Sequence, residues 1–435
     1  MRLSGRLSAA IEILKEFESR RAPLKTAIAD WSRVNRYAGA KDRAWISGLC
    51  LDVLRKRASL AAAMDDPSPR AVALAALRFM WRTPLGEIAE AAAEEPHGPG
   101  ALAENEAERL RAGGLSADAA DDAPAWIAAS LQRAFGDGWR DELAGLCARA
   151  DVDLRVNTLK TTPEKAFAAL KSVKAAPVDG APAAMRIPAP DPSERAPAVT
   201  VIPAFNKGWV EVQDLGSQIA AAAAGEIVGA QVLDFCAGGG GKTLALAAMM
   251  QNTGQLYAFD IDARRLKPLF HRAKRAGVRN LQIRSPAGGD GLDDLAGKMD
   301  VVFVDAPCTG SGTWRRHPDA KWRLTEKQLA KRMEEQDAAL DAAAQFVKPG
   351  GRLIYVTCSV LMEENDDRLD AFLKRHSAFA PGAVIDAIAN GGVDRETAQT
   401  KIARSAYGDA AIQMTPNRSQ TDGFFVATLV CGRSH

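Results

Sequence analysis

From Val212 onward the chain repeats a rhythm of short apolar run, turn and helical segment, and this rhythm limits the possible folds more than any other feature. The β-rich runs lie at Gln231–Phe235, Gln255–Phe259, Asp300–Val304 and Arg352–Val356. Apolar runs that alternate with helices are typical of a parallel sheet covered on both faces. We therefore expect an α/β fold with a doubly wound sheet, in which ligands bind at the carboxyl ends of the strands.

The residues before this region have two other patterns. Apolar residues recur at three and four up to about Leu60, with breaks at Pro23 and Gly39, and Ala71–Leu85 and Trp126–Ala150 continue this helical periodicity. Between those two blocks, 94–122 is rich in Glu, Ala and Gly and predicts a mobile or weakly packed connection.

A small α+β module is expected next. Leu154–Leu159 alternates like a strand and Pro163–Val173 reads as a helix, whereas 177–203 holds seven prolines, which disfavour both helix and central strand. We predict three domains: a helical domain at 1–145, the small module at 146–210 and the doubly wound domain at 211–435.

Charge is balanced overall but uneven along the chain. The 435 residues carry a net charge of +2, whereas residues 1–60 have a net charge of +7 and residues 61–150 of −7. The first segment is therefore a candidate surface for nucleic acid, although solvated helix faces give similar counts.

The six cysteines indicate neither a zinc site nor a dithiol motif. They are far apart, with no Cys-X-X-Cys and no histidine at zinc-ligand spacing, so we expect no metal and a reducing, cytoplasmic compartment. The first residues lack the apolar stretch of a signal peptide, and no apolar run of about 18 residues predicts a membrane span.

A glycine-rich turn follows the first run of the doubly wound region. Cys236, Ala237, Gly238, Gly239, Gly240, Gly241 and Lys242 lead into an apolar helix, so that backbone amides can approach a ligand closely. The glycine spacing matches neither a phosphate-binding P-loop nor a dinucleotide fingerprint. Asp260, after the second run, can accept both ribose hydroxyls, although a solvated turn acid is the simpler alternative. An adenosine ligand without pyrophosphate is implied, and S-adenosylmethionine fits.

Two later runs each lead to a thiol. Asp305-Ala-Pro-Cys308 follows the third run and Thr357-Cys358 the fourth, so both thiols are expected at one edge of the sheet. A single buried cysteine is usually a small hydrophobe. Two cysteines at the edge of the sheet that carries the cofactor loop suit methylation of carbon 5 of a pyrimidine. In this reaction a thiolate adds to carbon 6 and makes carbon 5 nucleophilic. An acid such as Asp305 suits assistance at the ring, and a second group is needed for release.

Six ordered segments carry a family resemblance, in addition to the strand-like Leu154–Lys160. They are VQDLGSQ (212–218), DFCAGGGGKT (234–243), FDIDARRL (259–266), DAPCTGSGTWRRHPDAKW (305–322), TCSVLMEEN (357–365) and TDGFFVA (421–427). Together they resemble the RNA cytosine-carbon-5 methyltransferase family, which includes bacterial 16S rRNA enzymes. The resemblance covers about 150–435 and implies a class I, Rossmann-like methyltransferase domain.

The resemblance ranks the two thiols, which the residues alone do not. It implies that Cys358 attacks carbon 6, that Cys308 assists release, and that Lys242 and Asp305 act near the base and cofactor. It also implies that 236–242 and Asp260 bind S-adenosylmethionine. Helices near 41–57 resemble a NusB-like RNA-binding domain. By analogy with the family we expect a monomer that acts on RNA, with rRNA as the favoured substrate.

Two departures from the family keep an alternative open. The loop has Gly238-Gly239-Gly240 where the family often has Ala-Pro-Gly, and 285–290 lacks the usual Gly-Asp, so that Asp290 is the candidate there for the adenine end. A catalytically weakened, RNA-binding ribosome-assembly factor with the same fold is the alternative.

Cations beside indole rings are further candidates for RNA contact. They lie in Trp314–His317 and Lys321–Arg323, where the alternative is a packed tryptophan with solvated arginines. The basic segment 264–275 is expected to be an outer helix face, with RNA contact as a second interpretation.

Overall fold

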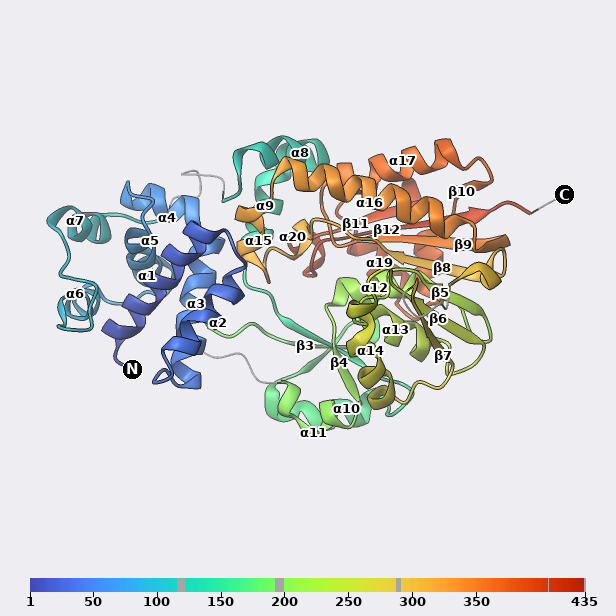
Figure 1. The fold of residues 1–435 in the computed structure, drawn as a ribbon, viewed down its shortest axis with the longest axis horizontal. Helices are drawn as coiled ribbons and strands as arrows, with labels where there is room; N and C mark the ends of the chain where they lie inside the picture. Colours follow the sequence, from blue (N-terminus) through green and yellow to red (C-terminus); the bar gives the residue numbers. More distant parts are fainter. Residues whose placement is uncertain (116–121, 192–198, 287–290, 406, 434–435) are drawn as a thin grey trace.

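A computed structural model describes residues 1–115, 122–191, 199–286, 291–405 and 407–433. Helices near the N-terminus form one end of an elongated molecule, and the large sheet with its helices forms the other (Figure 1). A smaller sheet lies between them, beside helix α14 (Ala263–Ala276). The two termini lie at opposite ends of the molecule.

The N-terminal part is a helical bundle. Its core contains Leu7, Ile11 and Leu14, which the helical spacing places on one face. The predicted breaks at Pro23 and Gly39 are the N-caps of the second and third helices. The helices are α1 (Leu3–Arg20), α2 (Leu24–Val34), α3 (Ala40–Arg55), α4 (Arg57–Met64), α5 (Pro69–Ala75), α6 (Leu85–Ala93) and α7 (Glu104–Ala112).

The described part of 94–122, expected to be a mobile or weakly packed connection, holds one helix and few buried side chains. Helix α7 lies within it and buries Leu110 completely in the bundle core. Glu106 accepts two hydrogen bonds from Arg70, at 2.7 and 3.0 Å, which ties the helix to α5. Burial of Leu110 and the ion pair with Arg70 therefore stabilise helix α7, although this segment has few hydrophobic residues.

Helices α8 (Ala125–Phe135) and α9 (Trp139–Cys147) pack elsewhere. Their apolar faces share a core cluster with Trp314, Leu329 and Val360 of the C-terminal region, not with the bundle. Ser130 and Arg133 of α8 also bind acidic residues of that region. The domain boundary at 145 stays a prediction, and these contacts favour an earlier one.

The small module is a four-stranded antiparallel sheet of order β2-β3-β1-β4. Its elements are β1 (Val152–Val156), α10 (Pro163–Leu170), β2 (Ala176–Val178), β3 (Ala181–Ile187), α11 (Pro203–Asn206) and β4 (Val210–Val212). The expectation that the proline-rich 177–203 holds no central strand is wrong, because β3 lies between β1 and β2. Pro182 precedes the residues that pair with β1, 184–187, so its missing N–H is not needed there.

The large sheet has the strand order β10-β12-β9-β8-β5-β6-β7, with β11 beside β12. Its strands are β5 (Gln231–Asp234), β6 (Gln255–Phe259), β7 (Leu281–Arg284), β8 (Met299–Asp305), β9 (Val347–Thr357), β10 (Phe379–Pro381), β11 (Ala411–Met414) and β12 (Phe424–Cys431). The four predicted runs are confirmed as β5, β6, β8 and β9. The purely parallel sheet is corrected, because β10, β11 and β12 pair in antiparallel fashion.

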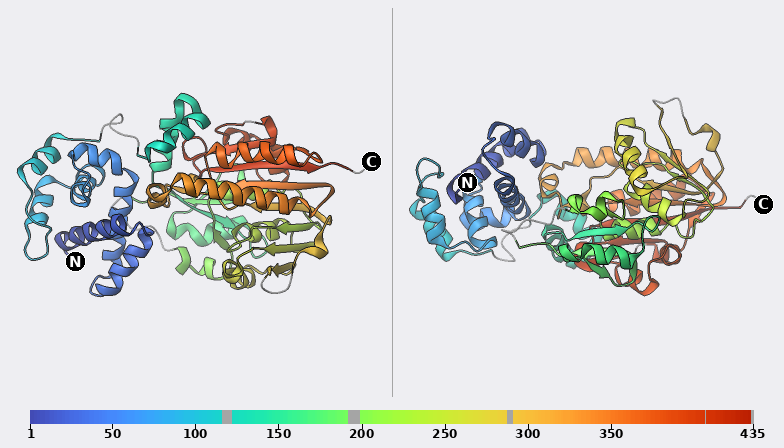
Figure 2. Two further views of the ribbon diagram at one scale, coloured as in Figure 1. Left: turned by 45° about the horizontal axis from the view of Figure 1, so that its top comes forward. Right: turned by 90° about the horizontal axis from the view of Figure 1, so that it is seen from below.

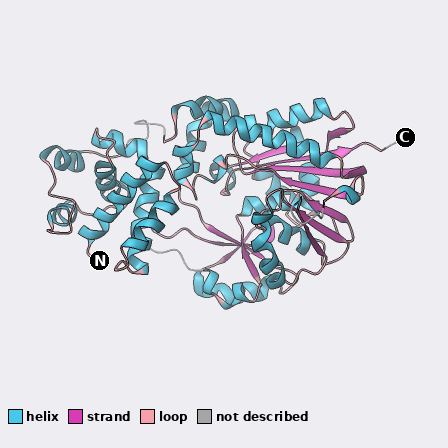
Figure 3. Cartoon of the chain, viewed as in Figure 1, coloured by secondary structure: helices cyan, strands magenta, loops and turns pink. Residues whose placement is uncertain are grey.

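Helices cover both faces of this sheet (Figures 2 and 3). One core layer forms under α12, α13 and α18, and the other under α16 and α17. The helices are α12 (Leu215–Ala222), α13 (Gly241–Met249), α15 (Pro318–Arg323), α16 (Glu326–Ala344), α17 (Asp366–Arg375), α18 (Val384–Asn390), α19 (Arg395–Thr400) and α20 (Pro416–Ser419), besides α14. The predicted α/β doubly wound class with a helical N-terminal part is confirmed.

The strand order determines which edge of the sheet can bind a ligand. From β5 the chain moves outward to β6 and β7, then returns across β5 to β8 and β9 on the other side. Such a reversal opens a crevice at the carboxyl ends of the two central strands. Both the glycine turn after β5 and the Cys308 turn after β8 begin there.

Candidate active site

The glycine turn after β5 has backbone angles that require glycine. Gly238 has φ 50° and Gly240 has φ 83°, and a Cβ at Gly240 would lie 2.3 Å from Leu269. Helix α13 begins at Gly241, so its first amides are directed toward this turn. The predicted close approach of backbone amides to a ligand is therefore available.

Asp260 lies directly under this turn. Its carboxylate is buried and accepts hydrogen bonds from the amides of Gly238 and Asp262, both at 3.0 Å. Arg265 lies 3.1 Å away and balances its charge. A buried carboxylate beside an amide-lined turn is a suitable group for sugar hydroxyls.

Ile261 is a neighbouring feature that sequence reasoning missed. Its side chain is 85% exposed, although it directly follows the buried Asp260. A large aliphatic side chain so exposed at a candidate ligand site offers a flat apolar contact for a purine ring. The turn, the carboxylate and this face together fit a nucleoside such as that of S-adenosylmethionine. Asp290 lies outside the described residues.

Lys242 and Asp305 form an ion pair between α13 and the end of β8. Lys242 Nζ lies 2.8 Å from Asp305 Oδ2, and the lysine side chain is only 10% exposed. Burial opposes protonation of Lys242, but the Asp305 carboxylate outweighs it and the pKa of Lys242 is raised. Cys358 also favours the charged form of this ammonium, so a positive charge lies near that sulfur.

Cys308 and Cys358 meet at the same edge. Strands β8 and β9 run parallel, with Asp305 opposite Val356, so the residues that follow them lie side by side. The two Sγ atoms are 3.3 Å apart and both residues are half-buried. The hydrogen bond with Cys358, followed by burial, raises the pKa of the Cys308 thiol.

Glu364 holds the Cys308 turn, and its role was also missed from the sequence. Its buried carboxylate accepts hydrogen bonds from Thr309 N at 2.7 Å and from Gln336 Nε2 at 3.0 Å. Gln336 also donates to Pro307 O at 2.9 Å. Burial raises the pKa of Glu364. The acid is part of the motif quoted above, but its partners become evident only in three dimensions.

The buried Asp234 and the half-buried Cys236 support the glycine turn. Asp234 accepts a hydrogen bond of 2.6 Å from Thr243 Oγ1, and its burial raises its pKa to about 7. Burial also raises the pKa of Cys236, so this thiol stays protonated. Cys236 therefore provides backbone and shape to the turn, not a reactive sulfur.

The predicted RNA contacts of Trp314, Arg315 and Lys321 are wrong, because these side chains are buried, and Arg316 is half-buried with its guanidinium paired. Trp314 and Lys321 are fully buried, and Arg315 is 4% exposed. Arg315 and Arg316 both bind Asp214 and Asp422. Their charges are thus used within the protein.

Helix α15 joins the catalytic region to the N-terminal bundle. Lys321 Nζ donates to Arg55 O, and Trp322 Nε1 donates to Leu54 O at 2.7 Å, both at the end of α3. Leu24 N donates to Asp319 across the same contact. Lys321 and Trp322 therefore hold α15 against the end of α3.

Helix α14 is an outer helix, as its basic spacing predicts. Arg272 and Arg275 bind the buried Glu211 of the small module, while Lys267, His271 and Lys274 are exposed. Across the described part of the chain, no group of three or more His, Cys, Asp or Glu residues is arranged to hold a metal ion. Nor does any helix there combine the length and apolar character needed to cross a membrane.

Comparison with known proteins agrees with this geometry. Residues 226–430 match the family model of the 16S rRNA methyltransferase RsmB/F, and residues 123–193 match the ferredoxin-like domain of RsmF/B-like methyltransferases. The second match includes α8 and α9 together with most of the small sheet.

Individual relatives extend the match. Ribosomal RNA small subunit methyltransferase B of Photorhabdus laumondii is 32% identical over 313 residues, which are 70% of this chain and 66% of that protein. The crystal structure of PH0851 aligns over 99% of both chains with a TM-score of 0.70 and 24% identity. That of NSun6 from Pyrococcus horikoshii with SFG aligns over 72% of this chain and 99% of its own, with a TM-score of 0.57 and 20% identity. The two structures share the fold, and the family models and the curated relative show that this chain belongs to the RsmB/F family of 16S rRNA methyltransferases.

Proposed function

We propose that this protein transfers a methyl group from S-adenosylmethionine to carbon 5 of a cytosine in 16S rRNA, through a transient bond between Cys358 Sγ and carbon 6. The observation that carries the proposal is the pair of thiols 3.3 Å apart beside the Lys242–Asp305 ion pair. Methyl transfer to an amine or hydroxyl requires no thiol, whereas carbon 5 of a pyrimidine requires nucleophilic activation.

The glycine turn, Asp260 and the exposed Ile261 would hold the methyl donor. S-adenosylmethionine, when bound, supplies an electrophilic methyl group. The turn amides of 238–241 would face its polar end, and the Asp260 carboxylate its ribose. Asp290 stays a predicted contact to the adenine end.

Lys242 would activate the Cys358 nucleophile, and Asp305 would activate the cytosine ring. The Lys242 ammonium stabilises negative charge on Cys358 Sγ, which adds to carbon 6 as a thiolate. Asp305, in its protonated form, would donate a proton to nitrogen 3 as the thiolate adds, so that carbon 5 becomes an enamine carbon and takes the methyl group, and Asp305 would take this proton back when Cys358 leaves. Both residues reach the ring from the switch point of the sheet.

Cys308 would serve the release step. After methylation, Cys308 in its thiolate form would accept the proton from carbon 5 and become a thiol, and the electron pair of that C–H bond would restore the carbon 5–carbon 6 double bond and expel Cys358 as a thiolate. Cys308 Sγ is next to Cys358 Sγ, so it lies at the carbon 5–carbon 6 edge of a ring bonded to Cys358. The glutamate-held turn keeps it there.

An RNA substrate places further demands on the chain. Carbon 6 cannot be reached in a stacked helix, so the target nucleotide must be held out of the stack. We propose that the NusB-like helical part contributes RNA contacts and that the protein acts in the cytoplasm. The rRNA relatives support this choice of substrate.

The test uses the full chain with methyl-labelled S-adenosylmethionine and two substrates, protein-free 16S rRNA and assembled small subunits. We expect label in one cytosine of the rRNA, mapped as 5-methylcytosine, and loss of transfer in Cys358→Ser. Cys431→Ser, a change at the far end of β12, is the matched control and should retain activity. Label at another base or atom, or full activity of Cys358→Ser, would refute the proposal. RNA binding without transfer would favour the assembly-factor alternative.

A further inference from the structure

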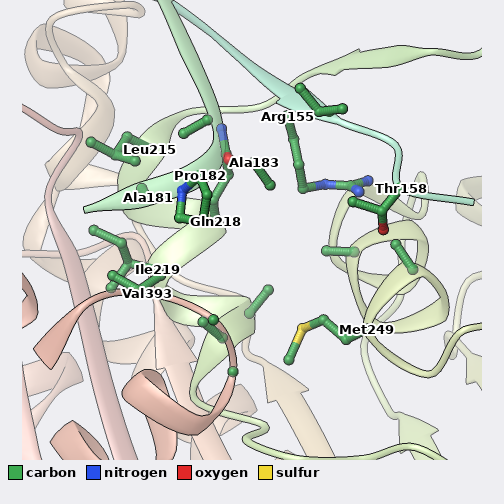
Figure 4. Close-up of a pocket in the computed structure, with 18 of the residues that line it drawn as sticks. Arg155, Thr158, Ala181, Pro182, Ala183, Leu215, Gln218, Ile219, Met249 and Val393 are labelled. Atoms are coloured by element: carbon green, nitrogen blue, oxygen red, sulfur yellow. The ribbon is translucent and has the colours of Figure 1, made fainter. Parts of the chain in front are cut away.

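A cavity of about 600 Å³ lies between the small module and the methyltransferase domain. It borders the C-terminal half of α13, whereas Lys242 lies in the first turn of that helix. Strands β1 and β3 form one wall, and α12, the end of α13 and the residues after α18 form the other (Figure 4). Its lining is mainly alanine, leucine, isoleucine, valine and methionine. This volume lies within the range of small-molecule pockets.

One cation faces this apolar space. Arg155 of β1 is 6% exposed, and Figure 4 shows its side chain extended across the cavity toward Thr158. Its Nε donates to Gln213 Oε1 at 2.7 Å, and its two terminal nitrogens make no other hydrogen bond in the described chain. The guanidinium therefore presents two donor groups to the cavity.

Arg155 differs from the other buried arginines of the described residues. Arg55 binds Asp52 and Arg315 binds Asp214 and Asp422, whereas Arg155 has no described carboxylate within 4.0 Å. Glu211, the acid that influences it electrostatically, is committed to two arginines of α14. Burial lowers the pKa of Arg155 to about 10, which leaves it charged at neutral pH. A buried cation that shares its nearest acid with two other arginines is costly, and an anionic ligand would relieve that cost.

The mouth of the cavity suits a polar head group and its interior suits a chain. Thr158 and Gln251 are exposed at its rim, while Leu215 and Ile219 are fully buried. From this arrangement we propose that the cavity binds a small amphiphilic carboxylate, with the carboxylate on Arg155 and the aliphatic body among Leu215, Ile219 and Met249. This ligand is distinct from RNA and from the methyl donor.

A ligand in the cavity would affect the position of Lys242 at the catalytic edge. Ala245, Ala248 and Met249 line it from the second half of α13, and the first turn of the same helix carries Lys242. A ligand between module and domain would therefore fix the helix that presents Lys242 to Asp305. The proposal does not depend on the reaction assigned above.

Isothermal titration of the full chain tests the head group and the chain separately. The probes are decanoate, decanol and decyltrimethylammonium, all below micelle formation, with acetate as the anion without a chain. We expect one decanoate per chain, at least ten-fold tighter binding than decanol, and no measurable binding of acetate or the cation. Ten-fold corresponds to about 1.4 kcal/mol.

Two variants locate the site. Arg155→Gln should reduce decanoate binding at least ten-fold and change decanol binding less than two-fold. Ala248→Phe, which fills the cavity from α13 and leaves Arg155 intact, should abolish binding of both. Arg418→Gln, at an exposed arginine, is the charge-matched control, and circular dichroism establishes that each variant is folded.

Three results would overturn the proposal. They are absence of saturable decanoate binding, equal affinity for decanoate and decanol, and retention of decanoate binding by folded Ala248→Phe. An oligoribonucleotide whose binding depends on Arg155 but not on Ala248 would identify Arg155 as a phosphate contact at the rim and would likewise overturn it.

Discussion

Replacement of Glu364 by alanine should loosen the turn that carries Cys308. The buried carboxylate is the hydrogen-bond acceptor for Thr309 N at 2.7 Å, for Thr309 Oγ1 at 2.5 Å and for Gln336 Nε2 at 3.0 Å. In the alanine variant the Thr309 N–H has no other acceptor, whereas Gln336 retains Pro307 O. Of the three donors, the Thr309 N–H is left without an acceptor, Gln336 is partly satisfied, and the hydroxyl of the half-buried Thr309 can rotate toward water. This gives a loss of about 2–4 kcal/mol, at about 1–3 kcal/mol for each buried unsatisfied group.

Glu364→Gln is the matched control. It keeps the shape and one acceptor oxygen, and the raised pKa of Glu364 indicates that a neutral group is tolerated at this position, so we expect a loss of about 1 kcal/mol or less. Urea unfolding followed by tryptophan fluorescence gives the stability difference, and methyl transfer to RNA reports the position of Cys308. We expect a ten- to hundred-fold slower turnover in Glu364→Ala and a smaller change in Glu364→Gln. An alanine variant as stable and as active as the parent would refute the reasoning.

Two further changes test the electrostatics of the glycine turn and of the nucleophile. Asp234 has its pKa raised from 3.8 to about 7, so between these pH values the folded chain retains a proton that the unfolded chain has released, and this group lowers stability as the pH rises. Asp234→Asn should therefore gain on the order of 2–3 kcal/mol relative to the parent between pH 5 and pH 8 in urea unfolding, and an unchanged difference would contradict the assigned burial. Lys242→Met removes the charge beside Cys358 and should slow alkylation of Cys358 by iodoacetamide at pH 7 about ten-fold, as read by mass spectrometry, whereas Lys242→Arg should retain most of the rate. Equal rates in both variants would show that the ammonium does not act on this sulfur.

The site was largely predictable because it lies where buried strands end. Apolar runs identify β5, β8 and β9, and the residues after them are fixed by the rule that parallel strands present their carboxyl ends at one edge. For that reason Cys308 and Cys358, fifty positions apart, could be expected together. Their ranking as nucleophile and release group is a family expectation that the geometry alone does not decide.

The parts that were not predicted depend on partners far along the chain. Arg315 resembled an RNA-binding residue until its partners, 101 and 107 positions away, were known. Strand β7 is short and only half-buried, so its residues give neither a clear apolar run nor clear alternation. Strand β12 was quoted as a motif, yet its place between β9 and β10 depends on pairing that no local pattern encodes.

The central claim, a covalent bond from Cys358 to the pyrimidine, is tested most directly by trapping that bond. Full-length variants are incubated with labelled 16S rRNA and S-adenosylmethionine and then resolved on a denaturing gel. We expect Cys308→Ala to accumulate a protein–RNA adduct, because addition proceeds and release does not, and we expect Cys358→Ala and the double variant to form none. An adduct in Cys358→Ala, or no adduct in a folded Cys308→Ala that binds RNA, would contradict the assignment of the two sulfurs.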